Sequence, residues 1–177
     1  MQFRHVAILI AGIVLIALAA IGAYFFVNKK QALVSEVKTE LQSVPDIIFK
    51  NIDGQDFSIS SLKGRLVVVH IWASWCSPCI EQIPDLLALQ EEFSDVIFVE
   101  LNRGETLEVI KKQRDQLDRD NHLLFIADGN DTFYKETYGF VMPEIFFLDK
   151  NGMIKDHVRG IENAEALRRR IQDISAR

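Results

Sequence analysis

Apolar and polar positions divide the chain into an N-terminal segment and a longer C-terminal part. Residues 6–27 form an uninterrupted stretch without a charged side chain, between Arg4 and Lys29. As a helix, this stretch would be about 33 Å long, close to the roughly 30 Å hydrocarbon core of a bilayer. The pattern therefore predicts that residues 1–27 are a cytoplasmic tail and a single transmembrane helix. The alternative is a cleaved signal peptide, whose apolar core is normally only about 7–15 residues long.

Residues 28–44 are polar but retain one apolar stripe. Leu33, Val37 and Leu41 recur every four residues, which is the spacing of one helix face. We expect a helical stalk that ends at Pro45, because proline cannot continue a helix. The alternative is a flexible tether between the anchor and the domain that follows.

The part from residue 45 to residue 177 alternates between predicted strands and predicted helices. Leu66–Trp72 is a continuous apolar run, which is typical of a strand buried on both faces. A helix is expected to follow over residues 77–93, and then a strand over residues 96–101. The other expected strands are residues 47–50, 57–59, 123–127, 144–148 and 154–158, and the other expected helices are residues 105–119, 132–138 and 164–174.

Turn residues near both ends of this domain indicate how the strands are connected. Asp53-Gly54 and Asn151-Gly152 are typical of tight hairpins between antiparallel strands, whereas helices separate the strands in the middle. We therefore expect an α/β fold, a three-layer α/β/α sandwich with a mixed central sheet. The alternative, a flavodoxin-like all-parallel sheet, would require a helix where Asn151-Gly152 predicts a turn.

Composition and charge exclude several classes of function. The 177 residues are 49% hydrophobic and 25% charged, with a formal net charge of −5. This balance provides no basic footprint for phosphates, so we expect no nucleic-acid partner. The two cysteines are too few for a disulfide-rich scaffold or for a structural zinc site with four ligands. They point instead to a reactive site.

The two thiols lie in the sequence Cys76-Ser77-Pro78-Cys79, directly after the buried strand and at the start of the next helix. The N-terminus of a helix favours a thiolate, because its unpaired N–H groups and its dipole stabilise negative charge. Cys76 is therefore the predicted nucleophile. Cys79, about one turn further on, is the predicted resolving thiol that attacks the mixed disulfide formed by Cys76. We expect this chemistry to need no cofactor and no metal ion.

Three alternative roles for the cysteine pair remain open. A structural disulfide would close a very short loop and stabilise the fold by only roughly 2 kcal/mol. Two unrelated buried cysteines are a second possibility. A metal site is the third, but it would need further ligands, and His70, His122 and His157 lie in three separate segments.

The segment from Trp72 to Cys79, with the sequence WASWCSPC, resembles the active-site motif of thioredoxin-like proteins. Residues 62–64 (LKG) upstream and residues 138–144 (YGFVMPE) downstream are similar to the membrane-anchored TlpA/ResA-type thiol–disulfide oxidoreductases. The resemblance extends from about residue 45 to residue 174. It implies a thioredoxin-like fold for this part of the chain.

The resemblance also implies roles for residues around the dithiol. Pro143 would be a cis-proline that faces the dithiol, an isomer found in only about 5–6% of X–Pro bonds. Met142 would offer its backbone to an extended substrate strand, and Trp75 would cover Cys76. Glu144 resembles the acidic residue that follows this proline in cytochrome-maturation relatives, where it would contact substrate.

The chain departs from the family at two positions. Thioredoxins have a buried Asp where this chain has His70, which would point toward the space behind Cys79. His70 is either a proton relay, which an unperturbed pKa of about 6.5 would suit, or a hydrogen-bonded core histidine. The family's usual glutamate three residues after the second cysteine is replaced by Gln82, while Glu81 is expected to face solvent.

We therefore expect a thiol–disulfide oxidoreductase that is tethered by residues 6–27 to the bacterial inner (cytoplasmic) membrane, with its C-terminal domain in the periplasm or at the cell exterior. It would reduce disulfide-containing proteins, for example in cytochrome c maturation, and be reduced again by a membrane electron donor. One alternative is a disulfide oxidant or isomerase. Others are a non-catalytic copper metallochaperone and a membrane-tethered adaptor.

Overall fold

The computed structural model describes residues 21–24, 43, 44 and 46–176. The chain divides into two compact units, Met1–Leu41 and Gln42–Arg177. The predicted anchor is described only at residues 21–24, which are helical, and the predicted stalk only at residues 43 and 44. The rest of both predictions lies outside the described residues. In the described part of the chain, no helix has the length and apolar character that crossing a bilayer requires.

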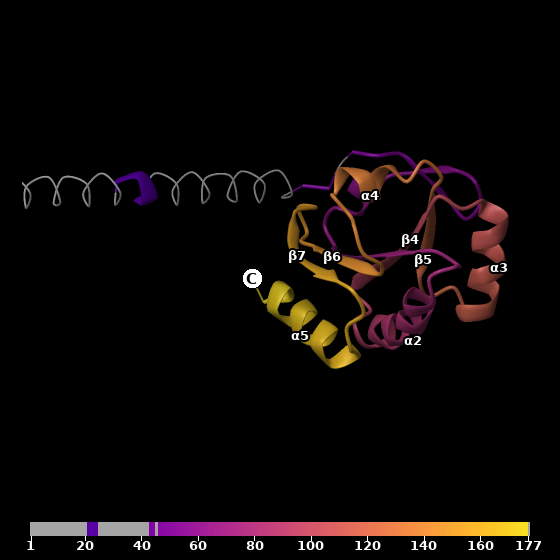
Figure 1. The fold of residues 1–177 in the computed structure, drawn as a ribbon. Coiled ribbons are helices and arrows are strands. Elements are labelled where there is room, and N and C mark those ends of the chain that lie inside the picture. Colours follow the sequence, from indigo (N-terminus) through magenta and orange to yellow (C-terminus); the bar gives the residue numbers. More distant parts are fainter. Residues whose placement is uncertain (1–20, 25–42, 45, 177) are drawn as a thin grey trace, which may run out of the picture. The chain divides into compact units, whose positions relative to one another are not determined.

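Seven strands of the described residues form one mixed sheet in the second unit (Figure 1). Their order is β2-β1-β5-β4-β3-β6-β7. The bounds are β1 Phe49–Asn51, β2 Asp56–Phe57, β3 Leu66–Trp72, β4 Val96–Arg103, β5 Leu124–Asp128, β6 Glu144–Leu148 and β7 Ile154–Arg159. Strands β3, β4 and β5 run parallel, whereas β1, β2, β6 and β7 pair antiparallel with their neighbours.

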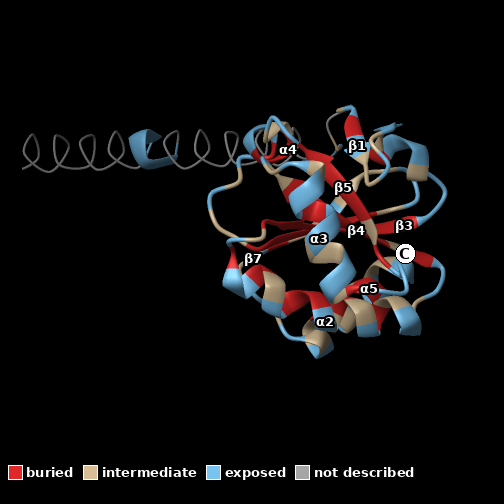
Figure 2. Cartoon of the chain, turned by 90° about the vertical axis from the view of Figure 1, so that its right-hand side faces the viewer, coloured by how far each residue is buried: buried red, intermediate tan, exposed pale blue. Residues whose placement is uncertain are grey.

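Helices cover both faces of this sheet (Figure 2). Helix α2 (Ser77–Glu92) connects β3 to β4, and α3 (Leu107–Leu117) connects β4 to β5. Because such parallel crossovers are right-handed, both helices lie on one face, where α5 (Ala164–Ser175) joins them in the same apolar cluster. Helix α4 (Thr132–Glu136) packs on the other face. The predicted three-layer sandwich with a mixed sheet is confirmed.

The hairpin between β6 and β7 excludes the all-parallel alternative. Gly152 has a φ of +79° in this turn, a conformation that glycine adopts without steric cost. β6 pairs antiparallel with both β3 and β7, so it joins the sheet opposite in direction to the central strands. A flavodoxin-like sheet has no strand in this orientation.

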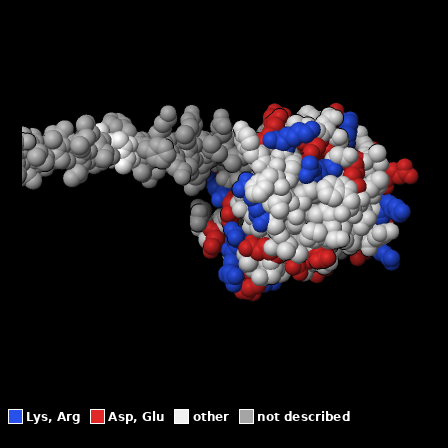
Figure 3. All heavy atoms as spheres, viewed as in Figure 1, with Lys and Arg blue, Asp and Glu red and all other residues white. Residues whose placement is uncertain are grey.

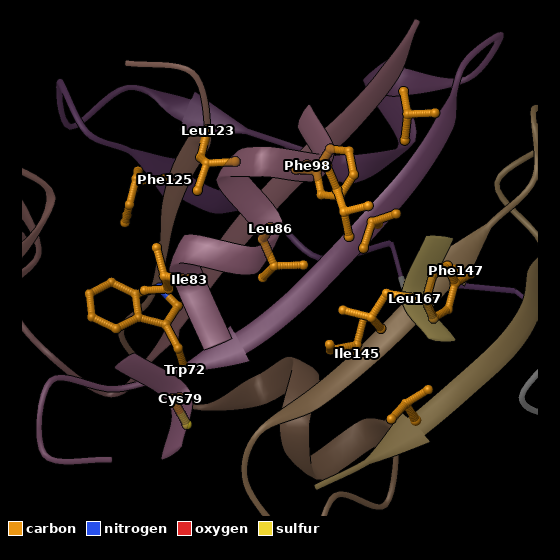
Figure 4. Packing of buried hydrophobic residues seen from close by; sticks show 14 of the residues in the cluster. Trp72, Cys79, Ile83, Leu86, Phe98, Leu123, Phe125, Ile145, Phe147 and Leu167 are labelled. Atoms are coloured by element: carbon orange, nitrogen blue, oxygen red, sulfur yellow. The ribbon is translucent and has the colours of Figure 1, made fainter. Parts of the chain in front are cut away.

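Side chains of β3 alternate between two apolar clusters. Val68 and Trp72 contact the cluster of α2, α3 and α5, whereas Val69 and Ile71 contact the cluster of α4. Trp72 is fully buried and packs edge-on against Phe125, with ring centroids 5.8 Å apart. Figure 4 shows Trp72 beside Cys79 and Ile83 of α2, with Phe125 further along, next to Leu123. The core therefore holds the end of β3 at a fixed position, and the dithiol follows directly.

One predicted strand is shorter than expected. The pattern predicts a strand over residues 57–59, but β2 ends at Phe57 and Ile59–Leu62 form a 3₁₀ helix. The hydroxyl of Ser58 caps this helix by accepting a hydrogen bond from the backbone N–H of Ser60. A serine that bonds to a nearby N–H competes with strand pairing, which explains the difference.

Candidate active site

Cys76 and Cys79 form a disulfide at the N-terminus of α2. Cys76 is the N-cap residue of this helix, and its Sγ accepts a hydrogen bond of 3.3 Å from the backbone N–H of Cys79. The exposed fraction is 6% for Cys76 and 0% for Cys79. Cys76 is therefore the more exposed of the two cysteines, and it lies where helix N–H groups stabilise a thiolate.

The peptide bond between Met142 and Pro143 is cis, as the resemblance implies. Pro143 directly precedes β6, in which Glu144 pairs with Ile71 near the end of β3. The carbonyl of Pro143 also accepts a hydrogen bond of 2.8 Å from the N–H of Gly160, after β7. The proline segment, before β6, and the dithiol, after β3, thus lie at the same end of these two neighbouring strands.

Glu144 is fully buried, so its carboxylate does not present a surface to a substrate as the family resemblance implied. It instead holds the segment that precedes the cis-proline. Its Oε1 accepts hydrogen bonds from the N–H groups of Phe140 (3.2 Å) and Val141 (3.3 Å). Its Oε2 lies 2.8 Å from Nε2 of His157 on β7. The contact between Glu144 and His157 depends on the pairing of β6 with β7, which places these two side chains on the same face of the sheet.

The environment of Glu144 also changes its acidity. Burial alone would raise its pKa, because it disfavours the charged form. The hydrogen bonds from His157 and from the backbone of Phe140 and Val141 outweigh burial, so the pKa of Glu144 lies below its usual value. The carboxylate is therefore ionised at neutral pH.

Large apolar side chains are exposed around this end of the sheet. They are Trp75, Tyr138, Phe140 and Ile161. Trp75 is 66% exposed, so it faces solvent beside Cys76. Figure 3 shows charges of both signs around an area without Lys, Arg, Asp or Glu side chains. Met142 is half-buried, and its sulfur accepts a hydrogen bond of 3.3 Å from Arg103.

His70 and Glu100 form a buried pair across β3 and β4. Nδ1 of His70 lies 2.7 Å from Oε2 of Glu100, and both side chains are buried. His70 Nε2 and Glu100 Oε1 have no hydrogen-bond partner among the described residues. Side chains two residues apart share a face of a strand, so His70 lies on the same face of β3 as Val68 and Trp72, whose cluster includes Cys79. His70 therefore lies on the face of the sheet that α2 covers.

Gln82 occupies a buried position on α2 and has a structural contact. Its Oε1 accepts a hydrogen bond of 2.9 Å from the N–H of Glu162, so it connects α2 to the loop after β7. Glu81 is exposed, which confirms the expected orientation. Neither side chain is a buried carboxylate beside Cys79.

Comparison with known proteins agrees with this geometry. The model of the Redoxin family matches residues 39–171. The chain belongs to the Redoxin family. A thioredoxin-like protein, YneN, from Bacillus subtilis is 29% identical, over 83% of this chain and 86% of its own length. The thiol-disulfide oxidoreductase ResA from Bacillus thuringiensis is 25% identical, over 92% of this chain and 94% of its own.

A solved structure supports the same assignment. The pneumococcal exposed lipoprotein thioredoxin Etrx1 from Streptococcus pneumoniae superimposes with a TM-score of 0.63 at 25% identity, covering 72% of this chain and 98% of that one. This Redoxin-family protein is therefore a thioredoxin-like protein of the TlpA/ResA type, and it is a thiol–disulfide oxidoreductase. Its relatives imply disulfide-containing proteins as substrates.

Three histidines lie within the described residues of this Redoxin-family protein, and each contacts a carboxylate. His70 contacts Glu100, His122 contacts Asp118, and His157 contacts Glu144. Within the described residues, no three or more His, Cys, Asp or Glu side chains are grouped so that they could hold a metal ion.

Two acidic residues of the site were missed in the sequence. Glu100 is the one charged residue of the apolar run at residues 96–101, and a charge in a buried strand was a usable signal. Glu105 contacts the segment before Cys76 through the side chain of Ser74, and no local pattern indicated this. Both contacts join residues about thirty positions apart.

Proposed function

We propose that this protein is a membrane-tethered reductant of disulfides in extracytoplasmic proteins. The observation that carries the proposal is the Cys76–Cys79 disulfide at the N-terminus of α2. It lies at the same end of the sheet as the cis-peptide bond before Pro143. In this arrangement a partner would react with the sulfur of Cys76, and an extended chain would bind beside the segment that precedes Pro143. Exchange with an extended segment of a protein substrate would use both.

Reduction proceeds in two exchanges that balance in atoms and electrons. The Cys76 thiolate attacks one sulfur of the substrate disulfide, forms a mixed disulfide, and releases the other substrate sulfur as a thiolate that takes up a proton. Cys79, as a thiolate, then attacks Cys76. The Cys76–Cys79 disulfide forms, the second substrate thiol is released, and two electrons have passed to the substrate.

Binding of the substrate uses the exposed edge of the site. An extended substrate segment pairs with the backbone of Met142 beside Pro143, while Trp75 contacts substrate side chains next to the reacting disulfide. The exposure of Trp75 and of the neighbouring apolar residues supports this role. Glu144 acts indirectly, because its hydrogen bonds to Phe140 and Val141 hold the segment in place.

His70 accepts the proton of Cys79 when this thiol attacks the mixed disulfide. Three observations support the assignment: His70 lies on the face of β3 that α2 covers, its Nε2 has no partner among the described residues, and its Nδ1 contacts Glu100. A carboxylate beside one ring nitrogen stabilises the imidazolium that forms when the other takes up a proton. Glu100 is thus the positioning residue of this relay.

The proposal also includes the attachment of the protein to the membrane and the re-reduction of its Cys76–Cys79 disulfide. Residues 6–27 anchor the protein in the bacterial cytoplasmic membrane, with the catalytic domain on the outer side. The uncharged length of this segment and the similarity to a solved protein named as an exposed lipoprotein thioredoxin support this location. A membrane electron donor reduces the Cys76–Cys79 disulfide after each turnover, and apocytochrome c is one candidate substrate.

A trapping experiment tests the proposal. Cys79→Ser removes the resolving thiol, so substrates should remain attached to Cys76 as mixed disulfides that reducing agent releases. The matched control is Cys76→Ser, which should trap nothing. Absence of any trapped protein under oxidising conditions would contradict the proposal. Equilibration of the dithiol with glutathione then gives the direction, since a potential close to that of the strong oxidants would identify an oxidant instead.

A further inference from the structure

The segment between β3 and Cys76 is held by a side chain from a different part of the fold. Glu105, in the loop between β4 and α3, accepts two hydrogen bonds from Ser74. The N–H of Ser74 donates to Oε2 at 2.7 Å, and its hydroxyl donates to Oε1 at 2.6 Å. One carboxylate thus fixes both the backbone and the side chain of a residue two positions before Cys76.

Glu105 is itself held in place by a buried residue. The side-chain amide of Asn102 donates to Oε2 of Glu105 at 2.7 Å, and the N–H of Glu105 donates to Oδ1 of Asn102 at 3.3 Å. Asn102 is fully buried and pairs with Trp72 across β4 and β3. The carboxylate therefore connects the ends of two neighbouring core strands to the segment that carries Cys76.

We propose that Glu105 is a positioning residue for the nucleophile, which holds Ser74 so that Cys76 remains the N-cap residue of α2. The inference rests on the proposed exchange function and deepens it. At the N-cap, the Cys76 sulfur accepts the Cys79 N–H and lies at the positive end of the helix dipole. Both contacts favour the thiolate. A looser segment would weaken them and make Cys76 less acidic.

The charge of Glu105 acts in the opposite direction. A carboxylate close to Cys76 disfavours a second negative charge, so its removal alone would lower the pKa of the thiol. A test must therefore change the contact and keep the charge. Glu105→Asp does this, because it withdraws the carboxylate from Ser74 by one methylene group. Ser74→Ala is the second variant, since it deletes the hydroxyl bond and leaves Glu105 unchanged.

The measurement is the pH dependence of alkylation of Cys76 in the reduced protein. We expect both variants to raise the pKa of the Cys76 thiol, and alkylation below that pKa to slow by about threefold to tenfold, one pKa unit being a tenfold change in thiolate. The double variant should change the rate no more than Glu105→Asp does, because the two residues act through one contact. Glu108→Asp on α3, an exposed glutamate, is the matched control and should leave the profile unchanged.

An unchanged or lowered pKa of Cys76 in the folded Glu105→Asp variant would overturn the proposal. Thermal unfolding shows whether each variant is folded. If Glu105→Asp does not fold, Ser74→Ala still tests whether the contact between Ser74 and Glu105 lowers the pKa of Cys76. The readout is independent of the physiological substrate. A failure to trap substrates would therefore refute the proposed function without affecting the result for Glu105.

Discussion

Replacement of Glu144 by Gln tests whether its carboxylate holds the cis-proline segment. Gln has nearly the same shape and can still accept the N–H groups of Phe140 and Val141. It loses the negative charge and therefore the charged contacts with His157 and Arg159. We expect the variant to fold, to be less stable at neutral pH, and to exchange disulfides more slowly, because the segment before Pro143 is less firmly held.

The expected magnitude follows from the contacts of the carboxylate. Hydrogen bonds to charged groups contribute about 1.5–3 kcal/mol each. Gln cannot reproduce the charged contacts with His157 at 2.8 Å and Arg159 at 3.7 Å, whereas the backbone donors keep an acceptor. His157 is 16% exposed in its side chain, so water can replace part of the lost contact. We expect the free energy of unfolding at neutral pH to fall by about 1.5–3 kcal/mol.

The pH dependence gives a second, independent check. The folded-state pKa of Glu144 lies below its usual value. The carboxylate therefore contributes stability that is present above the usual value and is lost as the pH falls through the folded pKa. The difference between wild type and variant should be full at neutral pH and shrink in acid.

Urea unfolding at neutral pH and in acid measures both effects. Glu81→Gln on α2, an exposed glutamate, is the control and should change stability by less than about 0.5 kcal/mol. Equal stabilities of wild type and Glu144→Gln at neutral pH would refute the reasoning. A difference that stays the same in acid would refute it as well, since the carboxylate would then not be its cause.

Two further variants test the proton relay and the exposed edge. His70→Asn should shift the pH dependence of the rate at which Cys79 resolves a mixed disulfide on Cys76, because Asn does not titrate; an unchanged profile would show that His70 is only a core residue. Trp75→Ala should change the free energy of unfolding by less than about 0.5 kcal/mol, since this side chain is 66% exposed. The same variant should raise KM for a disulfide-containing protein more than for a small disulfide, and equal effects on both would argue against a role in protein binding.

Local patterns predicted the elements of the fold well where burial is continuous. The expected strands at Leu66–Trp72 and Glu144–Leu148 have the same ends in the structure, because an apolar run bounded by polar or turn residues needs no knowledge of its partner. Prediction was weaker at Ser58, where a side-chain hydrogen bond replaced strand pairing. Prediction was also less accurate for the helix expected over residues 105–119. Helix α3 begins only at Leu107, and Glu105 lies in the preceding loop, where it binds Ser74.

The sequence by itself determined the α/β class, the mixed sheet and the reactive pair Cys76–Cys79, because periodicity, turn residues and cysteine spacing are all local. Only the tertiary structure decided what the acidic residues do. Glu144 turns inward, Glu100 meets His70, and Glu105 reaches Ser74. The two contacts of Glu100 and Glu105 depend on the parallel pairing of β3 with β4, and the position of Glu144 depends on the pairing of β6 with β7. A carboxylate's partner is set by strand register between distant segments, and a local pattern contains no information about that register.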